Sequence, residues 1–381
     1  MKKKILFIVT EDWYFISHRL KLAQYLIKKG YEVSVCCKDT GKAIDIERKG
    51  IAHFPLSIDR KSLSIFRFFR ENLKIISIVK KLNPEIVHLI SIRPIIIGVL
   101  SAFFTKSKFC VTFTGMGFLF IKKNFKIYLF RKMIITYLKA YLKFKNLFFI
   151  VQNKDDELFF KSVFNLKKTN LRIIRGSGID INYFKYFEEI TKTNIRLSYA
   201  GRILEDKGVL WLIEAFKLAK ARHSNLELYI AGPIDEKNPS SISKKHFEEL
   251  IDSKDINYLG NIKKIKKFWQ KADIAILLSK REGLPLSLLE AAATGRPIIS
   301  TDVTGSREIA INGYNAINIK VGNINECYRA ILKLTKNKTL RKKYGKNSRK
   351  LVEGDMALEH VNYQYYSLYK DMILLEGNNG F

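Results

Sequence analysis

The sequence contains no apolar run long enough to cross a membrane. Its most lipid-like stretch, residues 94–104, follows Arg93 and is about half of the ~20 apolar residues that a spanning helix needs. At the N-terminus, Glu11 and Asp12 end a short apolar run before it reaches the length of a signal-peptide core. We therefore expect a chain without a transmembrane helix or a secretory signal.

Cysteine is scarce, and the four that occur show neither metal-ligand spacing nor a disulfide pattern. Cys36 and Cys37 are adjacent in an apolar run typical of a strand, whereas Cys110 and Cys327 stand alone. We interpret all four as reduced core residues of a cytoplasmic protein. The sequence also lacks a His-Glu-x-x-His motif, a Walker loop and a persuasive Asp-x-Asp motif at a strand end, so we expect no cofactor and no metal.

Acidic residues are few, because 36 Asp and Glu stand against 68 Lys and Arg, which gives a net charge of +32. The excess is uneven: residues 1–185 carry 36 basic and 13 acidic side chains, whereas residues 186–381 carry 32 and 23. Such a charge implies an anionic partner, which can be nucleic acid, an anionic membrane or a phosphorylated substrate.

The basic charge is concentrated in residues 101–150, which contain ten Lys or Arg and no Asp or Glu. Ten Phe or Tyr lie among these cations between Phe118 and Phe149, and this mixture suits a bilayer interface. A solvated basic helix whose aromatics face the protein core is the alternative, and it stays open. We favour peripheral binding to the inner face of the cell membrane, since no helix-turn-helix, RNA-binding or zinc-finger pattern accompanies the charge.

Short β-branched runs alternate with helical stretches in two series, which predicts two α/β domains with doubly wound parallel sheets. The expected strands are residues 4–10, 31–37, 51–56, 85–90, 109–114 and 147–152, then 195–201, 226–232, 256–260, 273–279 and 296–302. We expect domains over residues 1–185 and 186–355, joined by a polar linker that begins near Gly176. A last helical stretch, within residues 356–381, is expected to pack back onto the first domain.

The most informative segment follows the expected strand 273–279 and reads REGLPLSLLEAAATG. Glu282 lies in the strand-to-helix turn, Gly283 lets backbone approach a ligand, and Pro285 suits the first helical position. Glu290 follows Glu282 after seven intervening residues, inside the helix. Two such carboxylates can accept hydrogen bonds from hydroxyls at two ends of an extended, sugar-like ligand. A capping acid followed by a solvated helix acid is the alternative.

This pattern resembles the E-x7-E motif of the retaining glycosyltransferases of family 4, whose GT-B fold consists of two Rossmann-like domains facing each other across a cleft. The resemblance implies that Glu282 contacts the donor sugar and Glu290 the nucleotide ribose. It also implies that the turn after Glu282 approaches the sugar and phosphates at a helix N-terminus. The residues of that turn are Gly283, Leu284, Pro285, Leu286 and Ser287.

A second match to the family is the segment YAGRILEDKG, in which a strand should end at Ala200 and Gly201 opens the turn. The resemblance implies that Arg202 and Lys207 hold the donor diphosphate and stabilise the leaving nucleotide. The chemistry agrees, because arginine binds phosphate through a fixed fork and lysine adds a mobile point charge. Two surface cations near a helix start are the alternative. The resemblance is strong over about residues 195–320 and rests mainly on architecture before them.

The N-terminal half departs from many family members, because no glycine-rich turn follows its first strand. Its start resembles that of bacterial enzymes that extend undecaprenyl-diphosphate-linked sugars, which implies that His18 and Arg19 bind the acceptor's diphosphate or a hydroxyl. A helix residue that satisfies the backbone is the alternative for His18. Thr114 and Gly115 open a turn that resembles one in the same group and offers N–H groups to an acceptor, although an ordinary strand-to-helix turn has the same pattern.

Together these features predict retaining transfer of a hexose or N-acetylhexosamine from a UDP-sugar to a polyprenyl-diphosphate-linked saccharide, as in O-antigen, capsule or protein-glycan assembly. Catalysis would then rest on positioning and charge stabilisation, with Arg202, Lys207 and Glu282 as the main residues. A UDP-sugar epimerase of the same fold is one alternative. A basic nucleic-acid-binding protein, suggested by charge alone, is another.

Overall fold

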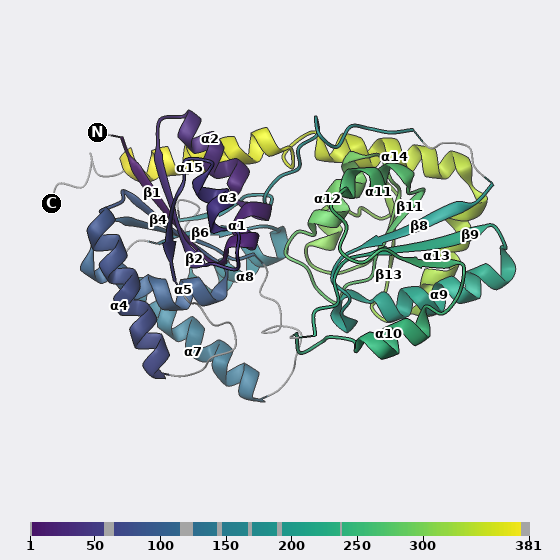
Figure 1. Cartoon of the computed structure of the whole chain (residues 1–381), viewed down its shortest axis with the longest axis horizontal. Coiled ribbons are helices and arrows are strands. Elements are labelled where there is room, and N and C mark those ends of the chain that lie inside the picture. Colours follow the sequence, from purple (N-terminus) through teal and green to yellow (C-terminus); the bar gives the residue numbers. More distant parts are fainter. Residues whose placement is uncertain are drawn as a thin grey trace. The chain divides into compact units, whose positions relative to one another are not determined.

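The computed structural model describes residues 2–56, 65–114, 125–142, 147–166, 170–188, 193–236 and 238–374 (Figure 1). The chain divides into two compact units. Unit 1 comprises Met1–Ser177 and Glu359–Phe381, and unit 2 comprises Gly178–Leu358. The boundary lies before the expected limit at residue 185, because the segment after Gly178 is bound to unit 2 through Arg349, which donates to the carbonyls of Ile181 and Phe184 at 3.2 and 2.7 Å.

Unit 1 is built on a parallel sheet with the strand order β3-β2-β1-β4-β5-β6-β7. Its strands are β1 Lys4–Glu11, β2 Glu32–Lys38, β3 Ala52–Pro55, β4 Ile86–Ile90, β5 Lys108–Thr112, β6 Leu147–Val151 and β7 Leu171–Ile173. Residues 86–90 and 147–151 are buried throughout, as expected of central strands that helices cover on both faces. The edge strand β7 was not predicted, because three residues are too few to show a pattern.

Helices cover both faces of this sheet. They are α1 Asp12–His18, α2 Leu20–Lys28, α3 Ala43–Glu47, α4 Ile65–Leu82, α5 Ile92–Gly98, the 3₁₀ helix η1 Val99–Phe104, α7 Phe125–Leu142, α8 Lys154–Phe164 and α15 Leu358–Leu374. One core contains α1, α2 and α15, and the other contains α4, α5, α7 and α8. The terminal helix α15 places Tyr365, Leu368, Tyr369 and Met372 in the first of these cores, so it belongs to unit 1.

Unit 2 has a parallel sheet with the order β10-β9-β8-β11-β12-β13 around a single core. The strands are β8 Ile195–Ala200, β9 Leu226–Ala231, β10 Ile256–Tyr258, β11 Ile274–Leu277, β12 Ile298–Thr301 and β13 Ala316–Ile319. The helices are η2 Glu205–Lys207, α9 Val209–Arg222, α10 Lys244–Leu250, α11 Ile265–Lys271, α12 Leu286–Ala293, η3 Ser306–Glu308, α13 Ile324–Lys336 and α14 Lys338–Val352. The short edge strand β13 was also not predicted.

The structure therefore has the predicted fold class, with two doubly wound α/β units. All four cysteines are buried as free thiols. In the part of the chain that the structure describes, no helix has the length and apolar character required to cross a membrane.

Candidate functional site

The predicted donor residues gather at the carboxyl ends of β8 and β11 in unit 2. These two strands are neighbours in the sheet. After β8 the chain continues to β9, towards one edge of the sheet, whereas after β11 it continues to β12, towards the other edge. Gly201 and Arg202 follow β8, and Glu282 follows β11. In open α/β sheets this reversal point leaves a crevice in which ligands bind.

Lys207 and Glu282 form the centre of this site. The Lys207 ammonium donates to Glu282 Oε1 at 2.5 Å, and the Ser279 hydroxyl donates to the same oxygen at 2.6 Å. The Glu282 side chain is 11% exposed and that of Lys207 is 22% exposed, so both are largely buried but still reach solvent. The carboxylate is thus held in one orientation by two donors to the same oxygen.

Two glycines allow the backbone around this pair to pack closely. Gly208, at φ +68°, precedes α9, and a Cβ there would lie 2.1 Å from the carbonyl oxygen of Leu278. Gly305, at φ +77°, lies against the turn at Glu282, and its Cβ would be 2.3 Å from the carbonyl oxygen of Gly283. Any other residue would push the turn away from its place, because the obstacle in each case is backbone.

Arg202 is the second predicted diphosphate ligand. Its guanidinium binds Asp235 at 2.9 Å, and its side chain is 42% exposed. The buried Tyr199 hydroxyl donates to the Arg202 carbonyl at 2.8 Å, which fixes the backbone of the turn. Asp235 holds one edge of the guanidinium and leaves the exposed remainder available for an anion.

Glu290 lies inside α12, which begins after the turn 283–285. Pro285 was predicted as the first helical residue but is the N-cap, so the helix begins one residue later, at Leu286. The Trp269 indole, buried on α11, donates to Glu290 Oε2 at 2.9 Å. Burial raises the pKa of the Glu290 carboxyl to about 7, even though the Trp269 hydrogen bond favours the ionised form.

Comparison with known proteins agrees with the fold. Residues 183–351 match the family model of glycosyl transferases group 1, and residues 4–153 match that of glycosyl transferase 4-like domains. Together the matched segments contain every strand of both sheets except β7, and every predicted donor residue. The chain belongs to the family 4-like glycosyltransferases.

Two bacterial relatives of this glycosyltransferase are named for capsular polysaccharide biosynthesis and for transfer to an undecaprenyl-diphosphate-linked sugar. It is 25% identical over 366 residues to the capsular polysaccharide biosynthesis glycosyltransferase CapM of Staphylococcus aureus, a match that covers 92% of each chain. It is 27% identical to the N,N'-diacetylbacillosaminyl-diphospho-undecaprenol alpha-1,3-N-acetylgalactosaminyltransferase of Campylobacter jejuni, with 81% of this chain and 82% of that one covered.

Solved structures show the same GT-B fold. One is Anabaena Alr3699/HepE in complex with UDP and glucose, with a TM-score of 0.75 at 15% identity, over 97% of this chain and 99% of that chain. At this level of identity the comparison establishes the shared fold.

In the glycosyltransferase's unit 1, His18 is the last residue of α1. Its Nδ1 lies 3.1 Å from the Ser177 hydroxyl, and its ring packs on Tyr14 with centroids 4.6 Å apart. Burial, with a smaller contribution from the charge of Arg19, lowers the pKa of His18 to about 4. His18 is therefore a neutral hydrogen-bonding group at physiological pH.

Arg19 is almost fully buried, at 1% exposure. It donates to the Gly176 carbonyl at 3.2 Å, and its guanidinium carbon lies 5.2 Å from the centroid of the Tyr365 ring. Two of its nitrogens, Nε and Nη2, have no hydrogen-bond partner. In this structure Arg19 braces the segment at Gly176 against α15, and its contact with an acceptor stays a prediction.

Thr114 lies beyond the end of β5, whereas Gly115 lies outside the described residues.

The sequence alone did not mark Ser91, which follows β4 with φ +75° in a conformation that few residues other than glycine adopt. It also missed Ser279, Asp235, Trp269 and Gly305, which reach the donor site from separate segments. Of these four, only Gly305 has a residue type that marks a turn in the sequence, because it follows the expected strand 296–302.

Proposed function

We propose that this glycosyltransferase moves a hexose or N-acetylhexosamine from a UDP-sugar to a polyprenyl-diphosphate-linked saccharide at the cytoplasmic face of a membrane, with retention of anomeric configuration. The observation that carries the proposal is the contact between Lys207 and Glu282 beside the start of α12. The cation and the helix N-terminus suit the negative charge of a diphosphate, and the oriented carboxylate suits a hydroxyl of the attached sugar.

Each part has a defined role in the proposed reaction. Lys207 and Arg202 neutralise the diphosphate, and Glu282 accepts a hydrogen bond from a donor-sugar hydroxyl. Glu290 accepts hydrogen bonds from the ribose hydroxyls, and Trp269 holds its other oxygen. Because negative charge grows on the leaving diphosphate as the glycosidic bond breaks, the two cations favour the transition state over the ground state.

The proposed step conserves the configuration of the anomeric carbon. The bond from that carbon to the diphosphate oxygen breaks, and the acceptor hydroxyl oxygen bonds to the same face of the carbon. The acceptor's proton passes to the leaving diphosphate oxygen. The protein supplies orientation and charge stabilisation for a transition state that resembles an oxocarbenium ion, with no covalent sugar–enzyme intermediate.

The relatives support the choice of substrates. The Campylobacter jejuni enzyme is named for an undecaprenyl-diphosphate-linked acceptor and an N-acetylgalactosaminyl group, and the Anabaena structure contains UDP and glucose. The free, buried thiols of Cys36, Cys37, Cys110 and Cys327 are compatible with the reducing cytoplasm, where sugar nucleotides are made.

The test is release of UDP by the purified protein with a panel of UDP-sugars, with and without a polyprenyl-diphosphate-linked monosaccharide in detergent. Release that depends on the acceptor with one donor, and a product whose anomeric proton coupling matches that of the donor, are expected. Isomerisation of a UDP-sugar without acceptor would replace the proposal with the epimerase alternative. Inversion at the anomeric carbon would contradict the mechanism.

A further inference from the structure

Large apolar side chains are exposed along α4 and α7 of unit 1. Phe66 is 82% exposed, Leu73 67% and Phe125 76%. Their neighbours follow helical spacing, so that each helix carries a continuous outer stripe. We call this surface, together with its cations, the aromatic–basic face. Its apolar residues are Phe66, Phe69 and Leu73 of α4, Phe104 of the neighbouring η1, and Phe125, Tyr128, Leu129 and Met133 of α7.

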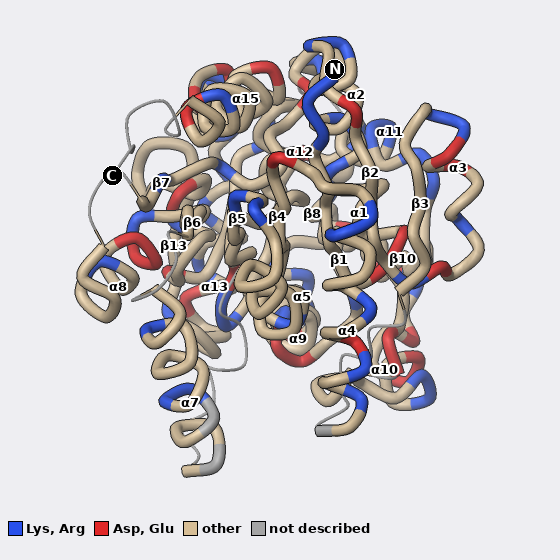
Figure 2. The backbone as a smooth tube through the Cα atoms, turned by 90° about the vertical axis from the view of Figure 1, so that its left-hand side faces the viewer, with Lys and Arg blue, Asp and Glu red and all other residues tan. Residues whose placement is uncertain are grey.

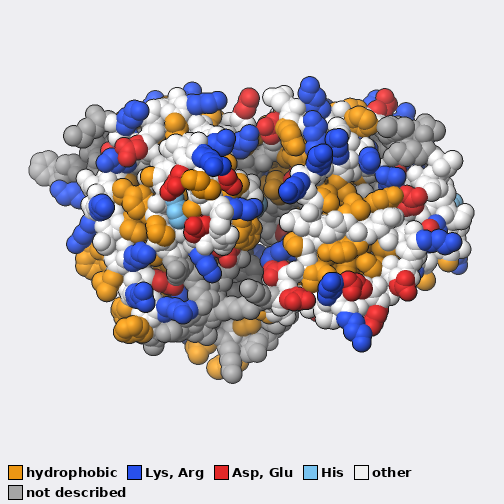
Figure 3. All heavy atoms as spheres, in the orientation of Figure 1, with side chains coloured by type: hydrophobic (Ala, Val, Ile, Leu, Met, Phe, Trp, Pro, Cys, Tyr) orange, Lys and Arg blue, Asp and Glu red, His pale blue; other side chains and the backbone are white. Residues whose placement is uncertain are grey.

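The inner sides of the same helices are already used for packing. Ile75 and Val79 of α4 and Ile134 and Leu138 of α7 are buried in the core of unit 1. An amphipathic surface helix would place mainly polar residues on the opposite side, whereas both helices also expose large apolar side chains there, among their cations. Both project from the same end of unit 1 in Figures 1 and 2, and Figure 3 shows apolar side chains at their ends.

Among the residues of this face that the structure describes, the exposed charges are all positive. Its exposed cations are Arg70, Lys74, Lys80, Lys81, Lys106, Lys132 and Lys139. Helix α7 contains no acidic residue, as Figure 2 shows. The single acid of α4, Glu71, is buried and forms an ion pair with Arg93 at 2.9 Å.

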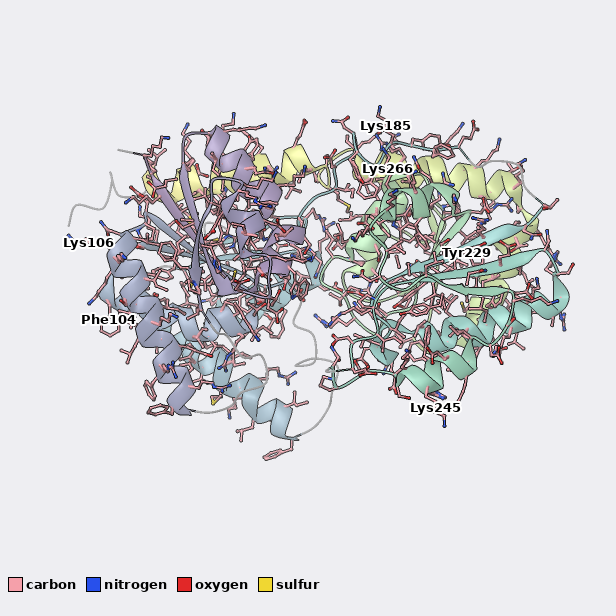
Figure 4. All side chains as sticks on the ribbon, in the orientation of Figure 1. Phe104, Lys106, Lys185, Tyr229, Lys245 and Lys266 are labelled. Carbon is pink, nitrogen blue, oxygen red and sulfur yellow. The ribbon has the colours of Figure 1, made fainter. Side chains whose placement is uncertain are left out.

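A groove joins the cations to the apolar residues where α4 ends beside η1. It has a volume of about 530 Å³ and is lined by Lys80, Asn83, Phe103, Phe104, Thr105 and Lys106. The Lys80 ammonium lies 5.8 Å from the centroid of the Phe104 ring. Figure 4 shows Phe104 and Lys106 at the outer edge of unit 1.

We propose that the aromatic–basic face docks on an anionic lipid bilayer. The aromatic and aliphatic side chains enter the interfacial region, and the lysines contact the anionic headgroups. This inference rests on the proposed function to the extent that a polyprenyl-linked acceptor lies in a membrane. Charge complementarity decides the occupant: exposed cations around protruding apolar side chains suit a fluid anionic surface, whereas nucleic acid would leave Phe66, Leu73 and Phe125 in water.

The structure assigns partly different residues to the membrane-docking surface than the sequence did. The sequence indicated residues 101–150, but Tyr141, Phe148 and Phe149 of that region are buried in the core. Helix α4, outside that region, supplies half of the aromatic–basic face instead. Charge density along the chain could not show this, because Glu71 and the core positions interrupt the pattern in α4.

The test is sedimentation of the full chain with vesicles made of equal amounts of phosphatidylglycerol and phosphatidylcholine, or of phosphatidylcholine alone. We expect binding to the anionic vesicles that weakens with added salt. The charge variant Lys74→Glu, Lys80→Glu, Lys132→Glu should lower the partition coefficient at least ~100-fold. The apolar variant Phe66→Ser, Leu73→Ser, Phe125→Ser should lower it by about 10-fold or more.

The matched control is Leu218→Ser with Leu259→Ser, which removes exposed apolar residues of unit 2 and should leave vesicle binding unchanged. Equal binding to both vesicle types, wild-type binding by both face variants, or a dimer that the apolar variant dissociates would overturn the proposal. Transfer to a water-soluble acceptor analogue is measured in parallel. Vesicle binding without transfer contradicts only the proposed function, and transfer without vesicle binding contradicts only the docking face.

Discussion

Lys207 and Glu282 are 75 residues apart in sequence, yet their charged atoms lie 2.5 Å apart. The contact joins the turn after β8 to the turn after β11. These are the two neighbouring strands at which the strand order of the parallel sheet of unit 2 reverses. Because Ser279 donates to the same carboxylate oxygen, the pair is already oriented before a ligand binds.

Replacing either member of this pair should abolish most of the activity. We expect Lys207→Ala and Glu282→Gln to lower kcat about 10²- to 10³-fold with acceptor present, since each removes a contact to the donor. Steady-state UDP release measures the effect. Lys217→Ala, an exposed cation on α9, is the control and should behave as wild type. Turnover close to wild type in either site variant, with an unchanged circular dichroism spectrum, would exclude this cluster as the catalytic centre.

Glu290 should make the protein less stable as the pH rises. Its folded-state pKa of about 7 lies above the ordinary value of 4.5, so the folded state binds the proton more tightly than the unfolded state does. Stability associated with this proton is present below pH ~4.5 and is lost as the pH rises through ~7. Glu290→Gln should therefore raise the free energy of unfolding by about 2 kcal/mol at pH 8 and leave it nearly unchanged at pH 4. Urea titrations at the two pH values measure the difference, and an equal effect at both would contradict the prediction.

Trp269 should control the pH range over which the site binds nucleotide. Its hydrogen bond favours the ionised form of Glu290, which accepts hydrogen bonds from ribose hydroxyls more strongly than the neutral form does. We expect Trp269→Phe to shift the midpoint of UDP binding to higher pH, with a loss of affinity of roughly 3- to 10-fold at pH 7 and a smaller loss at pH 9.

Isothermal titration with UDP across this pH range measures the shift in midpoint. Trp13→Phe, in unit 1, is the control, and its pH profile should match that of wild type. A loss of affinity that is the same at every pH would indicate that Trp269 serves packing alone.

Gly305 should be required for the geometry of the Glu282 turn. In Gly305→Ala the new Cβ would meet the Gly283 carbonyl oxygen at 2.3 Å in addition to the strain of a positive φ. Gly313 has nearly the same φ, +76°, but nothing lies within 4 Å of its Cβ position. We expect Gly313→Ala to cost about 1 kcal/mol of stability and Gly305→Ala about 3 kcal/mol or more, with weaker UDP binding only in the latter. Thermal unfolding and titration with UDP compare the two, and equal losses would show that backbone strain alone is responsible.

Much of the donor site could be predicted because its residues lie in local patterns. Glu282, Gly283 and Glu290 share one strand-turn-helix segment, and the apolar run before them marks the buried strand β11. Ser279, Asp235 and Trp269 could not be assigned in the same way. Nothing in the residues around them indicates a role. Their roles follow only from their contacts, which join Ser279 to Glu282, Asp235 to Arg202 and Trp269 to Glu290.

The sequence by itself determined the alternation of strands and helices, the two series of strands and the pair of carboxylates for which we propose a role in sugar-nucleotide binding. These features depend on period and spacing along the chain, which local propensity and burial impose. The tertiary structure alone decided which side of α15 packs in unit 1, where the Tyr369 hydroxyl lies 2.6 Å from His88 Nδ1 of β4. It also decided which aromatics of α7 are buried and which are exposed, because a helix that is apolar on both sides has no preferred side until its partners are in place.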